Sequence, residues 1–200
     1  MVQSLSQFMA NPGRAHLAAV KRVLRYIKGT LDLALVYGGD LPQCVPVGYT
    51  DADHGNDPNA HKSVSGYAFF LAGSIISWSS KKQPTMADST AVAEYIAIVH
   101  ATKEVLWLCS LLKELDFGLS SPMILHCDNQ ASISMSKDHI YHARTKHVDI
   151  KYHFIREHVT RKSIRLEYAP TAENVADIMT KALPRVKHTS FVMDLGLLAI

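Results

Sequence analysis

Four acidic residues have sequence neighbours unlike those of ordinary surface carboxylates; they are Asp51, Glu94, Asp128 and Asp177. Asp51 follows residues 45–50, which alternate in the manner of a strand, and Asp128 follows the apolar run 123–127. Carboxylates at the ends of strands are suited to hold a hard divalent cation. Two such cations about 4 Å apart can activate water and stabilise the leaving oxygen of a phosphodiester. The two strand-end acids therefore point to metal-dependent phosphodiester chemistry, provided that further carboxylates join them.

Glu94 and Asp177 are the helical candidates for the same site. Glu94 has Ala91, Ala97, Ile98 and Ala101 at three-, four- and seven-residue spacings, so this carboxylate does not belong to a charged helix face. Burial of a carboxylate is costly unless it is paired or bound to a metal. Most helical glutamates and most Asp-rich turns are solvated, so each acid by itself has an ordinary surface explanation. The order strand Asp, helix Glu, strand Asp, helix Asp favours the metal site.

The composition is that of a mildly basic chain with enough apolar residues for a folded core. It has 200 residues, 48% of them hydrophobic, with a net charge of +3 and a pI of about 8.7. This charge allows a polyanionic partner without requiring one. The three cysteines form no CxxC pair, which argues against a disulfide framework or a cysteine-rich zinc site. We find no apolar run of roughly 18 residues and no signal peptide, and therefore expect an intracellular protein.

The first forty residues differ in pattern from the rest. Apolar residues at three- and four-residue steps predict an amphipathic helix over residues 14–28, ended by Gly29. Its other face is basic, a pattern that solvation alone most often explains. Residues 31–37 could form a strand, and Gly-Gly-Asp at 38–40 predicts a linker. We therefore expect a boundary near residue 40.

Five strands and five helices are predicted beyond that boundary. The predicted strands cover residues 45–50, 63–72, 75–79, 123–127 and 164–168. The predicted helices cover residues 88–115, 130–136, much of 137–165, 172–181 and 184–195. Short connections join the first three strands, which predicts an antiparallel meander. The expected fold class is α/β, with a mixed five-stranded sheet in which parallel strands follow the meander and helices flank the sheet.

This element order and several motifs resemble ribonuclease H, specifically the ribonuclease H domain of copia-type LTR retrotransposon Pol polyproteins. The motifs are YTDAD (49–53), STAVAEY (89–95), LHCDNQASI (125–133), RTKHVDIKYHFIRE (144–157) and ENVADIMTKALPR (173–185). Residues 1–40 resemble the tail of the reverse transcriptase region that precedes this nuclease. The resemblance implies a reverse transcriptase remnant over 1–40, a ribonuclease H-like domain over 41–183 and a C-terminal helical tail over 184–200.

The resemblance also implies an activity, namely hydrolysis of the RNA strand of RNA·DNA hybrids. It carries over Asp51, Glu94, Asp128 and Asp177 as catalytic residues and as ligands of two Mg²⁺ ions, for which Mn²⁺ could substitute. The implied partners are the hybrid and the reverse transcriptase region, with no membrane. The implied location is cytoplasmic, in a virus-like particle, or nuclear. Polymerase activity is not expected, because the polymerase's own catalytic acids are absent from this sequence.

Two departures from the family pattern stand out. The family usually reads SSTEAEY before its long helix, whereas Val92 replaces the first glutamate of that pair here. The second glutamate, the expected ligand, is present as Glu94. Many cellular ribonucleases H also have a mobile histidine before the last Asp, but residues 169–176 contain none, so no proton-shuttling role is assigned.

Contacts to nucleic acid are expected from basic and polar residues outside the acidic centre. Residues 137–165 contain eight basic residues against three acidic ones. Phosphate contacts from such a segment would make binding strongly dependent on salt. The candidates are Lys81, Lys82, Asn129, Gln130, Arg144, Lys146, Lys151 and Arg156.

Several other interpretations compete with this one. An integrase of related fold would have its Glu last rather than second, and would follow an HHCC zinc module that is absent here. A catalytically inactive transposon relic, at most a nucleic-acid-binding or scaffolding domain, is the main alternative. The histidines crowded between residues 139 and 158 lack a zinc-binding spacing. Trp78 and Trp107 have apolar neighbours, so we expect them in the core rather than stacked on bases.

Overall fold

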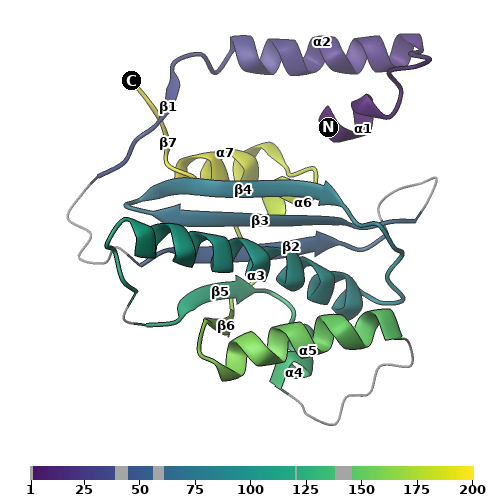
Figure 1. Cartoon of the computed structure of the whole chain (residues 1–200). Helices are drawn as coiled ribbons and strands as arrows, with labels where there is room; N and C mark the ends of the chain where they lie inside the picture. Colours follow the sequence, from purple (N-terminus) through teal and green to yellow (C-terminus); the bar gives the residue numbers. More distant parts are fainter. Residues whose placement is uncertain (1, 39–44, 56–60, 120, 138–145) are drawn as a thin grey trace.

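A five-stranded mixed sheet lies at the centre of the computed structural model, which describes residues 2–38, 45–55, 61–119, 121–137 and 146–200 (Figure 1). Its strands are β2 (Val47–Asp53), β3 (Val64–Leu71), β4 (Ser74–Lys82), β5 (Met123–Cys127) and β6 (Ile164–Tyr168). They lie in the order β4-β3-β2-β5-β6. The first three form an antiparallel meander, whereas β5 pairs parallel with both β2 and β6. The fold class expected from the sequence is confirmed.

The two edges of β2 end at different residues, and this difference positions the first acid. Towards β3 the strand stays paired as far as Asp53, with Asp51 opposite Gly66. Towards β5 the parallel pairing ends at Thr50, opposite Cys127. The prediction that Asp51 would lie at or beyond the end of its strand therefore holds only on the β5 side, because pairing with β3 carries the strand further.

One face of the sheet is covered by α3 (Thr90–Glu114), α4 (Gln130–Lys137) and α5 (Lys146–Thr160) (Figure 1). The Ser89 side chain caps α3 by accepting a hydrogen bond from the Val92 N–H at 3.2 Å. Apolar side chains of these helices pack against β3, β5 and β6 to form the main core; they include Phe69, Tyr95, Ile98, Val105, Met123, Leu125, Ile155 and Ile164. This core fixes α3, and therefore Glu94, against the sheet.

By length and mean hydropathy, α3 reaches the threshold for a membrane-spanning helix, which we did not expect from the sequence. In the described part of the chain, 56% of its most apolar window is buried within the protein. A core helix meets the same criteria, and α3 packs on the sheet as one.

The opposite face of the sheet carries α6 (Asp177–Thr180) and α7 (Arg185–Asp194) (Figure 1). A second apolar cluster joins them to β3 and β4; its buried members are Ala68, Ile75, Val175, Phe191 and Leu195. Gly66 of β3 faces α6 so closely that an added Cβ would lie 2.7 Å from Met179 Cβ and Thr180 Cγ2. The sequence left open whether Gly66 marks a bulge or a close approach. It marks a close approach, and the irregularity in the β3–β4 pairing lies between Phe69 and Phe70.

The helix predicted over residues 172–181 is much shorter, because the Asn174 side chain holds the preceding segment as turns. Its Nδ2 donates to the Thr50 carbonyl oxygen at 3.0 Å, and its Oδ1 accepts from the Ala176 N–H at 3.2 Å. Such local bonds compete with the helical pattern. The turn is thereby tied to β2 one residue before Asp51, and α6 begins at Asp177.

A short strand near residue 34 pairs with the C-terminal segment in a separate two-stranded sheet. Strand β1 (Leu33–Leu35) pairs antiparallel with β7 (Leu197–Ala199). Ahead of β1 lie α1 (Val2–Ser6) and α2 (Arg14–Lys28), and α2 begins and ends at the residues that the sequence predicted. None of the residues of α2 is buried, and Figure 1 shows this helix lying apart from the central sheet. The expected strand over 31–37 is therefore shorter, and it pairs with the C-terminal segment outside the central sheet.

The expectation that both tryptophans would be buried is wrong. Each of Trp78 and Trp107 is 56% exposed. Trp78 lies on β4, which is an edge strand of the sheet. Trp107 lies on the outer side of α3, because Val105 and Leu108 take the buried positions. Apolar neighbours in the sequence did not distinguish these two positions from core positions.

Candidate functional site

Asp51 and Asp128 come together at the point where β2 and β5 separate. Pairing between these strands ends at Thr50 and Cys127, and each aspartate is the next residue. One carboxylate oxygen from each of Asp51, Asp128 and Asp177 lies within 4.8 Å of the other two. Asp51 is fully buried, whereas Asp128 is partly exposed. The structure thus brings three of the four predicted acids into one cluster.

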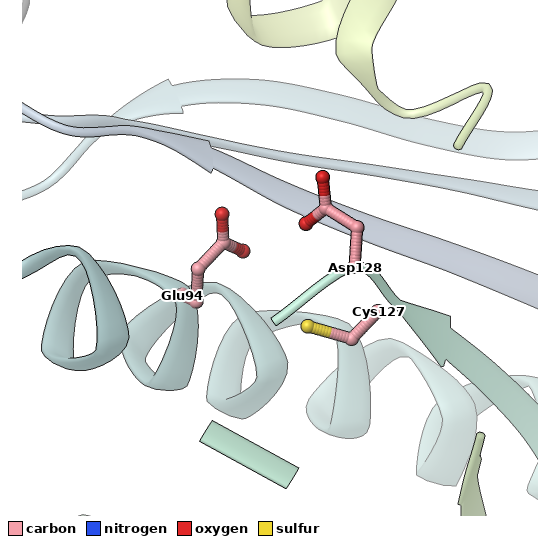
Figure 2. A group of neighbouring side chains, drawn as sticks. All are labelled: Glu94, Cys127 and Asp128. Atoms are coloured by element: carbon pink, nitrogen blue, oxygen red, sulfur yellow. The ribbon is translucent and has the colours of Figure 1, made fainter. Parts of the chain in front are cut away.

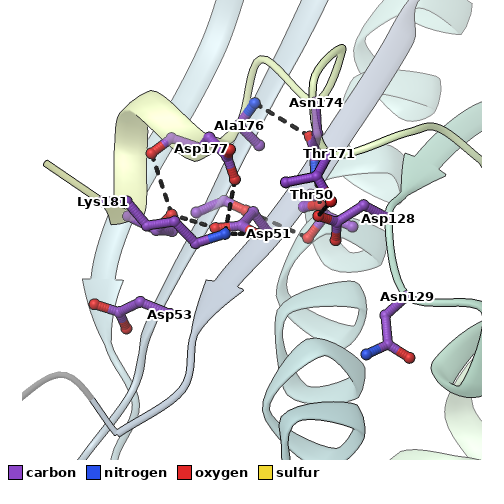
Figure 3. A network of polar contacts seen from close by, with 12 residues as sticks. Thr50, Asp51, Asp53, Asp128, Asn129, Thr171, Asn174, Ala176, Asp177 and Lys181 are labelled. Atoms are coloured by element: carbon purple, nitrogen blue, oxygen red, sulfur yellow. Dashed lines mark hydrogen bonds and ion pairs between the residues drawn. The ribbon is translucent and has the colours of Figure 1, made fainter. Parts of the chain in front are cut away.

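Asp177 reaches the cluster from the first residue of α6 and is 1% exposed. Its position follows from the turn that Asn174 ties to β2. Across the site, the Thr171 hydroxyl donates to Asp128 Oδ2 at 2.7 Å (Figure 3). The loop between β6 and α6 therefore contacts both strand ends and holds the third carboxylate between them.

Glu94 approaches from the other face of the sheet. It lies on α3 and is 6% exposed, and Figure 2 shows it rising from the helix near the loop that carries Asp128. Burial, followed by the charges of Asp51 and Asp128, raises the pKa of Glu94 to about 9. Its Oε2 atom is buried and has no hydrogen-bond partner within the described ranges. A buried polar atom without a partner is costly, and a bound ion at this place would satisfy it.

Cys127 is the thiol closest to this centre. Its Sγ, a Glu94 oxygen and an Asp128 oxygen lie within 4.8 Å of one another (Figure 2). Burial, followed by the charge of Glu94, raises the pKa of the thiol to about 12. The sulfur lies 3.5 Å from the Ser132 hydroxyl and accepts from the Asn129 N–H. Cys127 is therefore a protonated core residue at neutral pH, and the ionised donors of the site are carboxylates.

The set of donors fits magnesium better than a softer metal. Asp51, Asp128, Asp177 and Glu94 offer hard oxygen atoms, converge from two strand ends and two helices, and include the partnerless Glu94 Oε2. No histidine belongs to either of the two donor groups found among the described residues. The sequence therefore identified four carboxylates that the fold brings to one place.

Asp53 lies apart from this cluster although it is only two residues from Asp51 (Figure 3). Its carboxylate accepts a hydrogen bond from the Val64 N–H at the start of β3. It belongs to neither donor group in the part of the chain that the structure describes. This agrees with its expected role as a neighbour of the site.

Two lysines complete the centre, and sequence reasoning missed both. Lys181 Nζ lies 2.9 Å from Asp51 Oδ1 and 2.8 Å from Asp177 Oδ1. Lys187 Nζ lies 2.6 Å from Asp177 Oδ2. Burial raises the pKa of Asp51, and Lys181 opposes that rise. Burial alone would lower the pKa of Lys181, but the Asp51 and Asp177 carboxylates outweigh it and raise that pKa.

A four-residue spacing from Asp177 to Lys181 was the available signal for this contact. Residues four apart on a helix are neighbours, and α6 places them so. The contact to Asp51 and the position of Lys187 depend on tertiary packing, which the spacing does not reveal.

The predicted nucleic-acid contacts are dispersed over several elements. Arg144 lies outside the described residues, and Lys146 begins α5. Arg156 lies over the Tyr152 ring at 5.6 Å. Asn129 accepts from the Ser132 N–H at 2.9 Å and so caps α4, which Gln130 begins. Lys82 and the exposed Lys81 end β4.

Basic residues on β4, α3 and α5 form one patch. Burial lowers the pKa of His100, and the charges of Lys103, Lys81 and Lys151 lower it further. Burial and then the charge of Lys103 lower the pKa of Lys151. The four residues come from β4, α3 and α5, and the charges of the three lysines all act on His100. We call these four residues the basic patch; His100 and Lys103 were not foreseen, because a helix turn gives no sign of what packs beside it.

Comparison with known sequences gives a consistent set of relatives, although no protein-family model matches the chain. The chain is 45% identical over 183 residues to the retrovirus-related Pol polyprotein from transposon TNT 1-94 of Nicotiana tabacum, covering 92% of this chain and 14% of that protein. It is 38% identical over 197 residues to the one from transposon RE1 of Arabidopsis thaliana, covering 98% and 13%. The chain thus spans about one seventh of these relatives.

One shorter relative is matched over most of its own length. The secreted RxLR effector protein 161 of Plasmopara viticola is 44% identical over 107 residues, which are 52% of this chain and 72% of that protein.

Solved structures with a similar fold include a ribonuclease H1 and a viral protease-reverse transcriptase. LC11-RNase H1, isolated from compost by a metagenomic approach, aligns with a TM-score of 0.52 at 18% identity, covering 69% of this chain and 94% of that one. A foamy viral protease-reverse transcriptase in complex with RNA/DNA hybrid aligns with a TM-score of 0.51 at 17% identity, covering 74% and 21%. At these identities the likeness shows the fold, which is that of ribonuclease H.

Proposed function

Because the chain belongs to the family of copia-type retrotransposon Pol polyproteins, we propose that it is their ribonuclease H portion and hydrolyses the RNA strand of RNA·DNA hybrids. The observation that carries the proposal is the convergence of Asp51, Glu94, Asp128 and Asp177 at one end of a ribonuclease H sheet. Three of these carboxylates are at least nine-tenths buried. Such buried acidity requires compensating positive charge, which Lys181 and Lys187 supply in part and bound cations would complete.

These four residues would hold two Mg²⁺ ions, and Mn²⁺ would be an acceptable substitute. When bound, the ions supply Lewis-acid stabilisation of the phosphodiester and activation of water. The chain's own residues set the geometry: Thr171 orients Asp128 through its hydroxyl, and Asn174 fixes the turn that delivers Asp177. Glu94, neutral at pH 7 without metal, must release its proton as cations bind.

The hybrid would be held by electrostatic contacts to its phosphates. The basic patch offers three ammonium groups for such contacts, those of Lys81 on β4, Lys103 on α3 and Lys151 on α5. RNA would be distinguished from DNA by its 2′-hydroxyl groups, which lie in the wide, shallow minor groove of an A-like duplex. The reverse transcriptase region of the polyprotein is the partner that we propose for presenting the hybrid, and the location follows that of the polyprotein.

The direct test uses a hybrid whose two strands carry different end labels, with Mg²⁺ and with EDTA. We expect cleavage of the RNA strand and not of the DNA strand, in Mg²⁺ and not in EDTA. Matched RNA and DNA duplexes should not be cleaved. The chain should be assayed by itself and fused to a related polymerase region. Absence of cleavage in both settings would support the alternative, a catalytically inactive transposon relic.

A further inference from the structure

Every carboxylate oxygen of Asp51 and Asp177 is occupied by a donor from residues 180–187. Lys181 Nζ contacts Oδ1 of both aspartates, and Figure 3 shows its side chain reaching between them. The Thr180 hydroxyl donates to Asp51 Oδ2. Lys187 Nζ contacts Asp177 Oδ2. Each of the four oxygens thus already accepts a contact from the chain itself, and three of these contacts come from positively charged groups.

The two lysines hold different positions. Lys187 touches one of the clustered carboxylates and also donates to the Thr171 carbonyl oxygen at 3.0 Å, so it lies at one side of the cluster. Among the cationic side chains that the structure describes, Lys181 alone bridges two of the clustered carboxylates, those of Asp51 and Asp177. Its side chain is 34% exposed, so its flexible stem has a path towards solvent.

We propose that Lys181 is a built-in counter-ion of this centre that gives way to the divalent cation, and thereby sets the Mg²⁺ concentration at which the centre fills. The inference depends on the proposed function, because the cation concerned is the one that the nuclease needs. Its physical basis is that the ammonium group lies between the two carboxylates, where a divalent cation bound to both would meet a like charge at close range and be repelled. Without the ammonium group, Asp51 and Asp177 would be buried charges with less compensation, a costly arrangement.

The test is a Mg²⁺ titration by calorimetry and thermal melting, without nucleic acid, on wild type, Lys181→Met, Lys187→Met and Lys181→Arg. We expect Lys181→Met to be less stable in EDTA and to bind Mg²⁺ at least about ten-fold more tightly, because one competing positive charge is gone. Lys187→Met also removes one positive charge beside Asp177 but leaves Asp51 paired with Lys181. Its gain in Mg²⁺ affinity should therefore be clearly smaller. Lys181→Arg keeps the charge and should remain within about three-fold of wild type.

Three results would overturn the inference. Lys181→Met could bind Mg²⁺ no more tightly than wild type, or Lys187→Met could gain as much as Lys181→Met. Lys181→Met could also fail to fold even at saturating Mg²⁺, which would show that the cation cannot take over from the ammonium group. Absence of Mg²⁺ binding by all four proteins would instead contradict the proposed function.

Discussion

At the scale of single residues, Glu94 is the acid whose protonation equilibrium the fold displaces most clearly. Its pKa of about 9 in the folded chain exceeds the value of 4.5 expected for an unfolded glutamate. A raised pKa means that the folded state binds the extra proton, so its stabilising contribution is complete below pH 4.5 and lost as pH rises towards 9. In EDTA, the free energy of unfolding should therefore fall across this window, by at most about 1.4 kcal/mol per pH unit.

Glu94→Gln is the variant that checks this prediction. Glutamine resembles the protonated acid, so the variant should match wild type near pH 5 and exceed it in stability at pH 8. Urea unfolding in EDTA at several pH values measures the difference, with the exposed Glu114→Gln at the other end of α3 as the control. Parallel pH curves for wild type and Glu94→Gln would show that Glu94 is ionised in the folded chain.

The residue scale is also where sequence reasoning was least complete. Four carboxylates near one another suggest mutual repulsion, from which Asp51→Asn would be expected to stabilise the chain. In the structure, burial and the charges of Asp51 and Asp128 raise the pKa of Glu94, whereas Lys181 opposes the rise that burial causes at Asp51. The acids could be found from strand ends and helix periodicity, whereas Lys181 reaches Asp51 from 130 positions away in the sequence. No local pattern encodes such a contact.

At the scale of elements, Gly66 is the point where β3 lets α6 approach the sheet. Gly66→Ala would place a Cβ 2.7 Å from two side-chain carbons of α6. We expect a loss of about 1–3 kcal/mol in stability, as for other overpacked sites. Because α6 carries Asp177, the Mg²⁺ affinity of Gly66→Ala should also be lower than that of wild type. Gly118→Ala, where a Cβ meets nothing within 4 Å, is the matched control and should change neither property.

Thermal melting measures the stability of the two alanine variants, and calorimetry measures their Mg²⁺ affinity. Equal melting temperatures for the two alanine variants would mean that α6 moves away from the sheet at little cost. In that case the close approach would have no part in holding Asp177.

The basic patch gives a second prediction at this scale. Each phosphate that a protein neutralises adds about −0.9 to the slope of log K against log salt for a B-form duplex. Replacing Lys81, Lys103 and Lys151 together by glutamine should flatten this slope for a hybrid by about 0.9 for each phosphate that is no longer neutralised. Fluorescence anisotropy at several salt concentrations measures it. Lys113→Gln, in the last turn of α3, is the control, and an unchanged slope in the triple variant would mean that the patch is merely solvated.

Elements themselves were predicted well where pattern and packing agree. The bounds of α2, β5 and β6 match the sequence prediction, because apolar periodicity and flanking turns define them locally. The helix over 172–181 was overestimated because the Asn174 side chain bonds the end of β2. Trp78 and Trp107 were misplaced because periodicity reports which face is apolar, not whether anything covers it.

At the scale of the whole molecule, the C-terminal segment closes the second face of the sheet. Phe191 and Leu195 of this segment are buried against Ala68 and Ile75, and Lys187 contacts Asp177. Phe191→Ala should therefore cost about 3–5 kcal/mol in stability. Val186→Ala, on the same helix but 85% exposed, should stay within about 0.5 kcal/mol of wild type.

Chemical denaturation of both variants tests whether residues 184–200 belong to the folded unit. If Phe191→Ala were as stable as wild type, the segment would be an appendage to a domain that ends near residue 183. The proposed boundary near residue 40 is tested in the same way by removing α1 and α2, none of whose described residues is buried.

The central claim is that the four converging carboxylates are the metal centre of a ribonuclease H, and Asp128→Asn tests it most directly. Asp128 accepts a hydrogen bond from the Thr171 hydroxyl, which an asparagine oxygen can keep, so the fold should survive. Asp116→Asn is the control, because Asp116 is exposed and has a positive φ that asparagine tolerates. In Mg²⁺, we predict that wild type and Asp116→Asn cleave the RNA strand of a labelled hybrid, while Asp128→Asn melts normally but does not cleave. Equal cleavage by Asp128→Asn and wild type would contradict the assignment of the site.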